Sequence, residues 1–197
     1  MSADPNDPVA AFSEYAADRL WVASHLGQFI GIVSIGVALL TLGRTLRDGP
    51  AVEAYVLIGG AGAVASVATA AALQAVDGVA LKAMVDAWAA APAEQKDAAF
   101  HAAYGVRRIE VGLASLTSLL LGLTTLAYAL ALRATRSYPR WLGAAGLAGA
   151  AGLLVSGVAL AYSGFSPLEM DVSMPSSLGL MLFLVVFGLM ALRRPSA

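Results

Sequence analysis

The residues of this chain that could carry chemistry gather where long apolar segments begin or end. His25 lies near the start of one apolar segment, Asp77 ends the next, and Glu110 begins a third. If these segments cross a membrane, ionisable side chains at their ends are the first candidates for ligand binding or proton transfer, since histidine titrates near neutral pH. The complete set of candidate ligand-binding residues is His25, Gln28, Asp77, His101, Tyr104, Arg107, Arg108 and Glu110.

Each of these candidates also has a purely structural interpretation. Arg107 and Glu110 are three residues apart, so they can pair on one helix face and stabilise the start of a helix. His25 can be hydrogen-bonded to a neighbouring helix, as buried polar groups require. The dipeptide Asp77-Gly78 is typical of a turn. Binding or catalytic roles for these residues are therefore alternatives to structural roles, and the sequence leaves both open.

No cofactor is predicted from the sequence. The chain has no cysteine, which excludes disulfides, thiolate nucleophiles and iron–sulfur ligation by cysteine. Its only lysines, Lys82 and Lys96, lie outside the long apolar segments, so no lysine at membrane depth can form a Schiff base. A haem with two histidine ligands, or a metal site, is an alternative that would use His25 and His101, the only histidines.

The composition indicates a membrane protein. The chain has 197 residues, of which 59% are hydrophobic and 13% are charged, and its mean hydropathy is +0.76. Soluble domains carry about 25% charged residues. Because so few charged residues cannot cover a water-facing surface, lipid must be the main solvent. The length of the chain fits one integral membrane domain. The net charge of −1 provides no basic field that would attract nucleic acid.

Apolar segments long enough to cross a bilayer recur along the chain. Residues 111–132 carry no charge, and at about 1.5 Å per residue such a helix spans the roughly 30 Å hydrocarbon core. In other segments glycine and alanine recur every three or four residues, which is typical of closely packed membrane helices. The sequence therefore predicts an all-α polytopic bundle of five transmembrane helices. The spans are expected at about 21–42, 54–76, 111–132, 141–163 and 177–192.

The segment between the second and third spans has a different pattern. After a break at Asp77-Gly78, the spacing of Leu81, Val85 and Trp88 places them on one face of a short helix. This helix is too short and too charged to cross a bilayer. We therefore expect residues 78–104 to form an extracytoplasmic amphipathic helical cap on the membrane surface. Two further expectations are a short interfacial helix at 9–19 and a turn-rich loop at 164–175.

The charges of the connecting segments predict the orientation of the bundle. Five spans put the two termini on opposite sides of the membrane. The segments at one end are rich in arginine and those at the other end are mainly acidic, and short basic loops remain in the cytoplasm. We therefore predict a bacterial inner-membrane protein with its N-terminus outside and its C-terminus in the cytoplasm. The basic residues assigned to the cytoplasmic side are Arg44, Arg47, Arg133, Arg136, Arg140, Arg193 and Arg194.

Short motifs spread over most of the chain carry a resemblance to a known kind of family. They are Trp21-Val-Ala-Ser-His25, Asp77-Gly-Val-Ala-Leu-Lys82 with Asp86-Ala-Trp88, Arg108-Ile-Glu110 and Tyr138-Pro-Arg-Trp-Leu-Gly143. Together these motifs resemble a group of uncharacterised bacterial multi-pass membrane proteins, of the domain-of-unknown-function kind. The resemblance implies an integral membrane protein and supplies no activity.

The sequence favours a binding function without catalysis. We expect the protein to bind a hydrophobic or lipid-like ligand, or a membrane partner, through a polar-mouthed pocket on its outer side. Residues 78–104 would act as a lid, while His25, Asp77, Arg108 and Glu110 would orient the polar end of the ligand.

Two alternatives remain open. The first is a membrane enzyme, with Glu110 as acid or base, Arg108 holding an anion, and His25 as proton shuttle or metal ligand. The second is an accessory subunit of a larger membrane complex, in which the same polar residues have only structural roles. The glycine-rich helix faces would equally allow a homo-oligomer.

Overall fold

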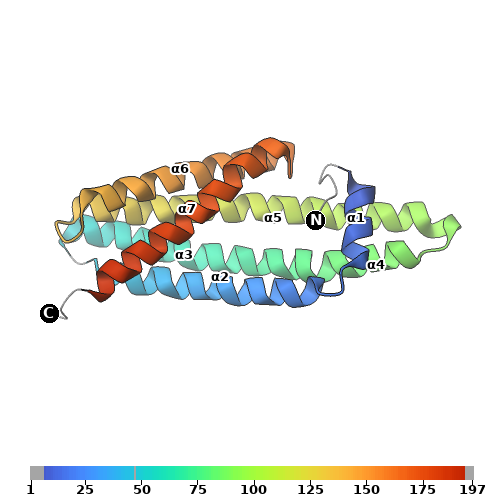
Figure 1. Cartoon of the computed structure of the whole chain (residues 1–197), viewed down its shortest axis with the longest axis horizontal. Coiled ribbons are helices and arrows are strands. Elements are labelled where there is room, and N and C mark those ends of the chain that lie inside the picture. The colour runs from blue at the N-terminus through green and yellow to red at the C-terminus, as the bar shows by residue number, and fades with distance from the viewer. Residues whose placement is uncertain (1–6, 47, 194–197) are drawn as a thin grey trace.

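Long helices form an elongated bundle in the computed structural model of the protein (Figure 1). The structure describes residues 7–46 and 48–193, with only the backbone of Leu168. Within these residues every regular element is helical, and five helices are long and apolar enough to cross a membrane, which confirms the predicted fold class. The elements are α1 (Pro8–Ala17), α2 (Trp21–Gly43), α3 (Pro50–Ala75), the π-helical segment η1 (Val76–Leu81), α4 (Lys82–Ala90), α5 (Ala93–Ala134), α6 (Arg140–Ser163) and α7 (Pro167–Leu192).

The two ends of the bundle differ in charge as the sequence predicts. One end, here called the arginine end, holds the α2–α3 and α5–α6 connections and the C-terminal end of α7 (Figure 1). The opposite end, here called the hairpin end, holds α1, α4 and the first half of α5. Which end faces the cytoplasm stays a prediction from the arginine distribution. Arg44, Arg133, Arg136, Arg140 and Arg193 lie at the arginine end, whereas Arg47 and Arg194 fall outside the described residues.

Small residues allow the helices to close around one large aromatic side chain near the arginine end. Tyr128 of α5 is only 1% exposed. A Cβ atom added to Gly43 or to Gly59 would lie 3.0 Å from the Tyr128 ring, so α2 and α3 can approach this closely only because both residues are glycine. Leu39 of α2 and Phe187 of α7 belong to the same buried cluster. At this end, therefore, α2 and α7 are held in one core.

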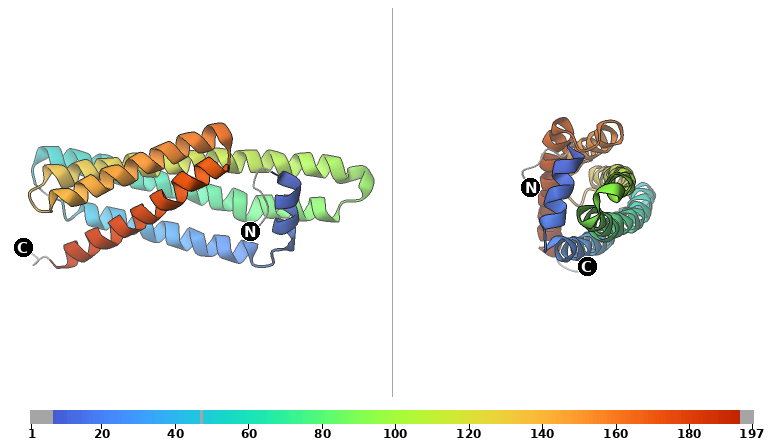
Figure 2. Two further views of the ribbon diagram at one scale, coloured as in Figure 1. Left: turned by 45° about the horizontal axis from the view of Figure 1, so that its top comes forward. Right: turned by 90° about the vertical axis from the view of Figure 1, so that its right-hand side faces the viewer.

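Residues 78–104 do not form the separate cap that the sequence predicts. The predicted break at Asp77-Gly78 is wrong, because α3 continues through η1 into α4 without a turn. Helix α5 is likewise a single helix of 42 residues, about 63 Å long and about twice the thickness of the hydrocarbon core. As a result, α4 and the first half of α5 project beyond the other helices as a helical hairpin (Figures 1 and 2).

Helix α1 lies across the bundle and packs against this hairpin (Figure 2). The ring of Phe12 is fully buried, and its centroid lies 5.9 Å from that of Trp88 and 5.7 Å from that of Phe100. Asp7 caps the first turn by accepting hydrogen bonds from two backbone N–H groups. The helix predicted at 9–19 is thus confirmed, although it packs on protein over much of its length.

The loop predicted at 164–175 is also wrong over most of its length. Helix α7 begins at Pro167, directly after Ser166, whose hydroxyl accepts a hydrogen bond from the Glu169 N–H at 3.2 Å. Serine at the cap and proline in the first turn are strong signals for a helix start. Pro175 lies inside α7, as membrane helices tolerate. Glu169 therefore belongs to the first turn of a helix.

Asp48 joins the two connections at the arginine end. Its carboxylate accepts hydrogen bonds from the hydroxyl of Thr135, from the Arg136 N–H at 2.9 Å and from the hydroxyl of Ser137 at 3.3 Å. These donors, first of all the Thr135 hydroxyl, lower the pKa of Asp48 below its usual value. A lowered pKa in the folded state stabilises the protein above the unfolded-state pKa, and this contribution is lost as the pH falls through the folded-state pKa.

We expect Asp48→Asn to lower the melting temperature slightly at neutral pH and to flatten its decline below about pH 4. The effect should be small because Asp48 is exposed to solvent. The measurement is thermal unfolding in detergent across this pH range. Asp171→Asn, at another exposed position, is the control and should leave the profile unchanged. Identical acid profiles for Asp48→Asn and the parent protein would contradict the prediction.

Candidate functional site

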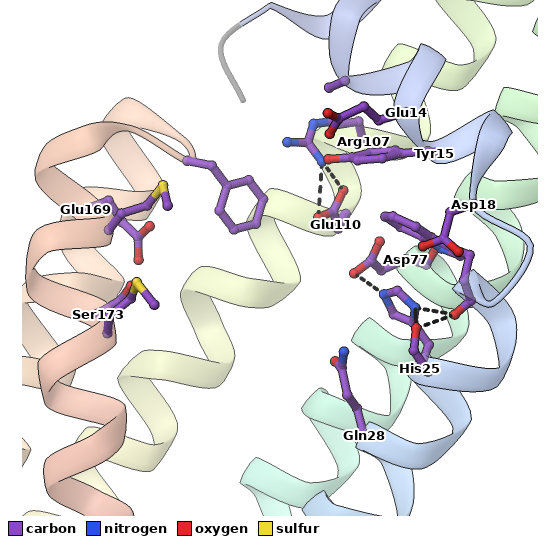
Figure 3. A pocket seen from close by; sticks show the side chains of 16 residues that line it. Glu14, Tyr15, Asp18, His25, Gln28, Asp77, Arg107, Glu110, Glu169 and Ser173 are labelled. Atoms are coloured by element: carbon purple, nitrogen blue, oxygen red, sulfur yellow. Dashed lines mark hydrogen bonds and ion pairs between the residues drawn. The ribbon is translucent and has the colours of Figure 1, made fainter. Parts of the chain in front are cut away.

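A pocket of about 560 Å³ opens between the helices at the hairpin end. Its walls come from α1, the first turns of α2, η1, the middle of α5 and the start of α7 (Figure 3). Helices α2 and α7 share a core at the arginine end, whereas at this end the pocket lies between them. Its acidic and basic lining residues are Glu14, Asp18, His25, Asp77, Arg107, Glu110 and Glu169.

His25 and Asp77 form a pair that joins α2 to η1. Nδ1 of His25 lies 2.7 Å from the backbone oxygen of Trp21, and because a carbonyl oxygen only accepts, Nδ1 must carry a hydrogen. Nε2 lies 3.0 Å from Oδ2 of Asp77, and this contact needs one further proton. The proton resides either on Nε2 or on the carboxyl group, so the pair is an ion pair or a neutral pair, with no net charge in either form.

The surroundings of this pair hold it in place. The Trp21 indole stacks on the His25 ring at 4.6 Å, and its Nε1 donates a hydrogen bond to the backbone oxygen of Asp77 at 3.0 Å. A Cβ atom on Gly78 would lie 2.5 Å from the Cβ of His25. Gly78 therefore allows η1 to approach α2, which explains a glycine inside a continuous helix. Single π-helical turns of this kind frequently occur at functional sites.

Arg107 and Glu110 form a second, more deeply buried pair. They are 6% and 3% exposed, and the Arg107 guanidinium donates to Oε2 of Glu110 at 3.1 Å. The guanidinium also lies over two aromatic rings, at 5.5 Å from the centroid of Tyr15 and 5.0 Å from that of Phe165. Burial raises the pKa of Tyr15, while the nearby Arg107 acts in the opposite direction. Arg107 thus connects α5 with α1 and with the α6–α7 connection.

Glu169 is a buried carboxylate that lies in the predicted loop at 164–175 and is not among the predicted site residues. It is 4% exposed, and its Oε1 accepts a hydrogen bond from the hydroxyl of Ser156 at 3.0 Å. Among the residues that the structure describes, none forms a salt bridge with it. A sequence signal was available, since serine at position 166 followed three residues later by glutamate is typical of a capped helix start.

Only part of the predicted residue set comes together in the pocket. Arg108 is exposed and outside it, because neighbouring residues on a helix point about 100° apart and Arg107 faces inward. His101 and Tyr104 lie further out on α5, where His101 is 3.5 Å from Asp97. The predicted candidates that line the pocket are His25, Gln28, Asp77, Arg107 and Glu110.

The two histidines, which a haem or metal site would use together, have separate surroundings. His25 is enclosed by Trp21 and Asp77, whereas the His101 side chain is 68% exposed on the hairpin. In the described part of the chain, no group of three histidine, aspartate or glutamate side chains is arranged to hold a metal ion. The polar groups of the pocket include two pairs, His25 with Asp77 and Arg107 with Glu110, and further carboxyl groups.

Comparison with known proteins identifies the family of the chain. No curated protein and no solved structure matches it. A family profile does match, over residues 3–188, and the matched region contains every residue that lines the pocket. The chain therefore belongs to the family described as domain of unknown function DUF4386, which confirms its predicted place in an uncharacterised family.

Proposed function

We propose that the protein binds an amphiphilic molecule, a lipid or another apolar compound with a polar head, in the pocket at the hairpin end. The observation that supports this most directly is the pocket itself, with a volume of about 560 Å³. Ligand pockets of about 300–1,000 Å³ usually combine apolar walls with a few polar groups that orient the ligand. Here Phe165, Met170 and Met174 provide apolar surface beside the two polar pairs.

The depth of the pocket suits a lipid-like molecule. Trp21 is the first residue of α2, and Asp77 follows the end of the apolar helix α3. Tryptophan is enriched at the boundary between hydrocarbon and water, where lipid head groups lie. A ligand could therefore place its head among the charged groups and its chain in the hydrocarbon between α2 and α7.

Helix α1 is the cover of the pocket, a role that the sequence predicts for residues 78–104. Ala11 and Tyr15 of α1 line the pocket, and Tyr15 packs on Trp21 with ring centroids 4.3 Å apart. The projecting hairpin supports α1 through the buried cluster around Phe12. The enzyme and accessory-subunit alternatives stay predictions.

Ser173→Phe is the variant that tests the proposed function. Ser173 lines the pocket from α7, so a phenylalanine there should fill the space that a ligand needs. Ser177→Phe is the matched control, because Ser177 lies one turn further along α7, exposed and outside the pocket. Each protein would be purified in a mild detergent and examined by native mass spectrometry for a retained amphiphile.

We expect the parent protein and Ser177→Phe to retain bound non-protein mass, and Ser173→Phe to lose most of it at a similar melting temperature. Equal retention by all three proteins, or no retention by the parent protein, would contradict the proposal. A lower melting temperature in Ser173→Phe alone, with retention unchanged, would also count against it.

A further inference from the structure

We infer that the polar head of the amphiphile is a cation, an ammonium group or another protonated amine, and that Glu169 holds it. This inference rests on the proposed function and adds the chemical class of the ligand. It follows from the charge of the pocket lining, from the surroundings of Glu169 and from the aromatic rings nearby.

The lining of the pocket is acidic. The His25–Asp77 pair carries no net charge, whichever residue holds the shared proton, and the Arg107 guanidinium is already engaged by Glu110 at 3.1 Å. These two pairs include the only basic residues in the lining. The lining also carries two carboxyl groups outside these pairs that belong to Asp18 and Glu169.

Glu169 differs from the exposed Asp18 because it is buried. It is 4% exposed and has one hydrogen bond from a side chain, donated by the neutral hydroxyl of Ser156. Buried carboxylates are normally paired with a cation, because burial without a countercharge is costly. No cation of the described residues lies within 4.0 Å of Glu169. A cationic ligand in the pocket would supply this missing countercharge.

The position of Glu169 allows such a contact. Figure 3 shows Glu169 on the α7 wall, across the pocket from the Arg107–Glu110 and His25–Asp77 pairs. The carboxylate is thus separated from the basic groups of the opposite wall by the space that a ligand would fill.

Arg107 shows how a cation is accommodated at this site. Its guanidinium lies over the rings of Tyr15 and Phe165 and beside a carboxylate. Aromatic faces attract cations, and the effect grows where water is excluded. An anionic head would instead approach Glu169 without a cation left to bind it, and such repulsion is an effective source of specificity. The pocket therefore favours a cationic head over a neutral one, and a neutral head over an anionic one.

The test uses heads of different charge on the same decyl chain. Decyltrimethylammonium, decyl maltoside and decyl sulfate would each be titrated calorimetrically into nanodiscs of digalactosyldiacylglycerol, a bilayer lipid without an amine, that contain the protein, with empty nanodiscs as the blank. We expect the cation to bind on the order of tenfold more tightly than the neutral probe, because its charge is attracted to the Glu169 carboxylate and to aromatic faces, and we expect decyl sulfate to bind most weakly. Tetramethylammonium, which lacks the chain, should bind far more weakly than its decyl counterpart.

Glu169→Gln identifies the residue responsible. The glutamine keeps an acceptor for the Ser156 hydroxyl but removes the charge, so we expect the ratio between the affinities for decyltrimethylammonium and decyl maltoside, both measured on this variant, to fall to about one. Asp171→Asn is the matched control, because it removes an exposed carboxylate two residues further along α7 and outside the pocket. This control should keep the full preference for the cation.

The outcomes separate this inference from the proposed function. Equal affinities for all three heads, abolished by Ser173→Phe, would overturn the cation preference and leave amphiphile binding in place. Binding of no probe above the blank would remove both. A preference for the cation that survives in Glu169→Gln would overturn the assignment to Glu169.

Competition by phosphatidylethanolamine added to the nanodiscs would support the inference with a membrane lipid as the source of the amine. Cation binding without such competition would support it with a free amphiphilic amine as the source.

Discussion

Replacing Arg107 with methionine is expected to destabilise the protein by about 3–5 kcal/mol, because it leaves the buried Glu110 without its partner. Both residues are almost fully buried, and the guanidinium donates to the Glu110 carboxylate at 3.1 Å. Methionine has a similar length and fills much of the same space, so the loss would report the unpaired charge rather than a cavity. The measurement is unfolding of the purified protein in detergent.

Two companion variants make this prediction specific. Arg108→Met removes the neighbouring, exposed charge and should change stability by less than about 1 kcal/mol. Adding Glu110→Gln to Arg107→Met removes the unpaired carboxylate and should restore much of the loss. The rest would remain, since Arg107 also lies over Tyr15 and Phe165. If Arg107→Met costs no more than Arg108→Met, the pair does not stabilise the protein in the way proposed.

The membrane bundle could be predicted from the sequence because a bilayer leaves few choices to an apolar chain. Backbone groups in hydrocarbon must bond within their own segment, so an apolar segment of sufficient length becomes a helix. Helices α2 and α6 have nearly the bounds of their apolar segments. Helix α5 does not, because its hydrogen bonding continues far beyond the charge-free residues 111–132. Hydropathy predicts which residues of a helix lie in the bilayer, whereas the residue at which the helix ends depends on capping residues and prolines.

Only two properties of the site could be predicted from the sequence: contacts between residues closely spaced on one helix, and the approximate depth of each residue in the membrane. The Arg107–Glu110 pair follows from a three-residue spacing on one helix. The contact of His25 with Asp77 joins residues far apart in the sequence, and it requires Gly78 to bring η1 against α2. Depth alone placed Arg108 in the site, although it lies on the outward face of α5. Which faces meet is decided by packing, which one sequence does not display.

The cover of the pocket is the largest difference between expectation and structure. The amphipathic pattern at 78–104 was interpreted as a helix on the membrane surface, but its apolar face packs inside a hairpin and against α1. An apolar stripe shows that a helix has a covered side and does not show what covers it. Here the cover of the hairpin is α1, and the same helix contributes Ala11 and Tyr15 to the wall of the pocket.

Phe12→Ala should therefore release α1 while the membrane helices stay folded. Phe12 is fully buried against Trp88 and Phe100, and truncating a buried phenylalanine typically costs about 3–5 kcal/mol. The loss should be local, because the cluster around Phe12 is separate from the core around Tyr128. Hydrogen exchange of the amides in Pro8–Ala17 should accelerate on the order of a hundredfold or more. Val9→Ala, at a residue that is 52% exposed, should leave this exchange nearly unchanged.

The same variant separates the cover of the pocket from its polar groups. Trp21 is 3% exposed and packs under Tyr15, so release of α1 should make Trp21 accessible to acrylamide quenching. Trp88 and Trp141 would be replaced by phenylalanine in every protein compared, so that Trp21 is the only tryptophan and can be excited without the tyrosines. If exchange in α1 accelerates but Trp21 stays protected, then α1 docks through Phe12 without closing the pocket, and the pocket must be shielded by α7 instead. If neither changes, the contacts of Tyr15 with Trp21 and Arg107 are sufficient to hold α1 in place.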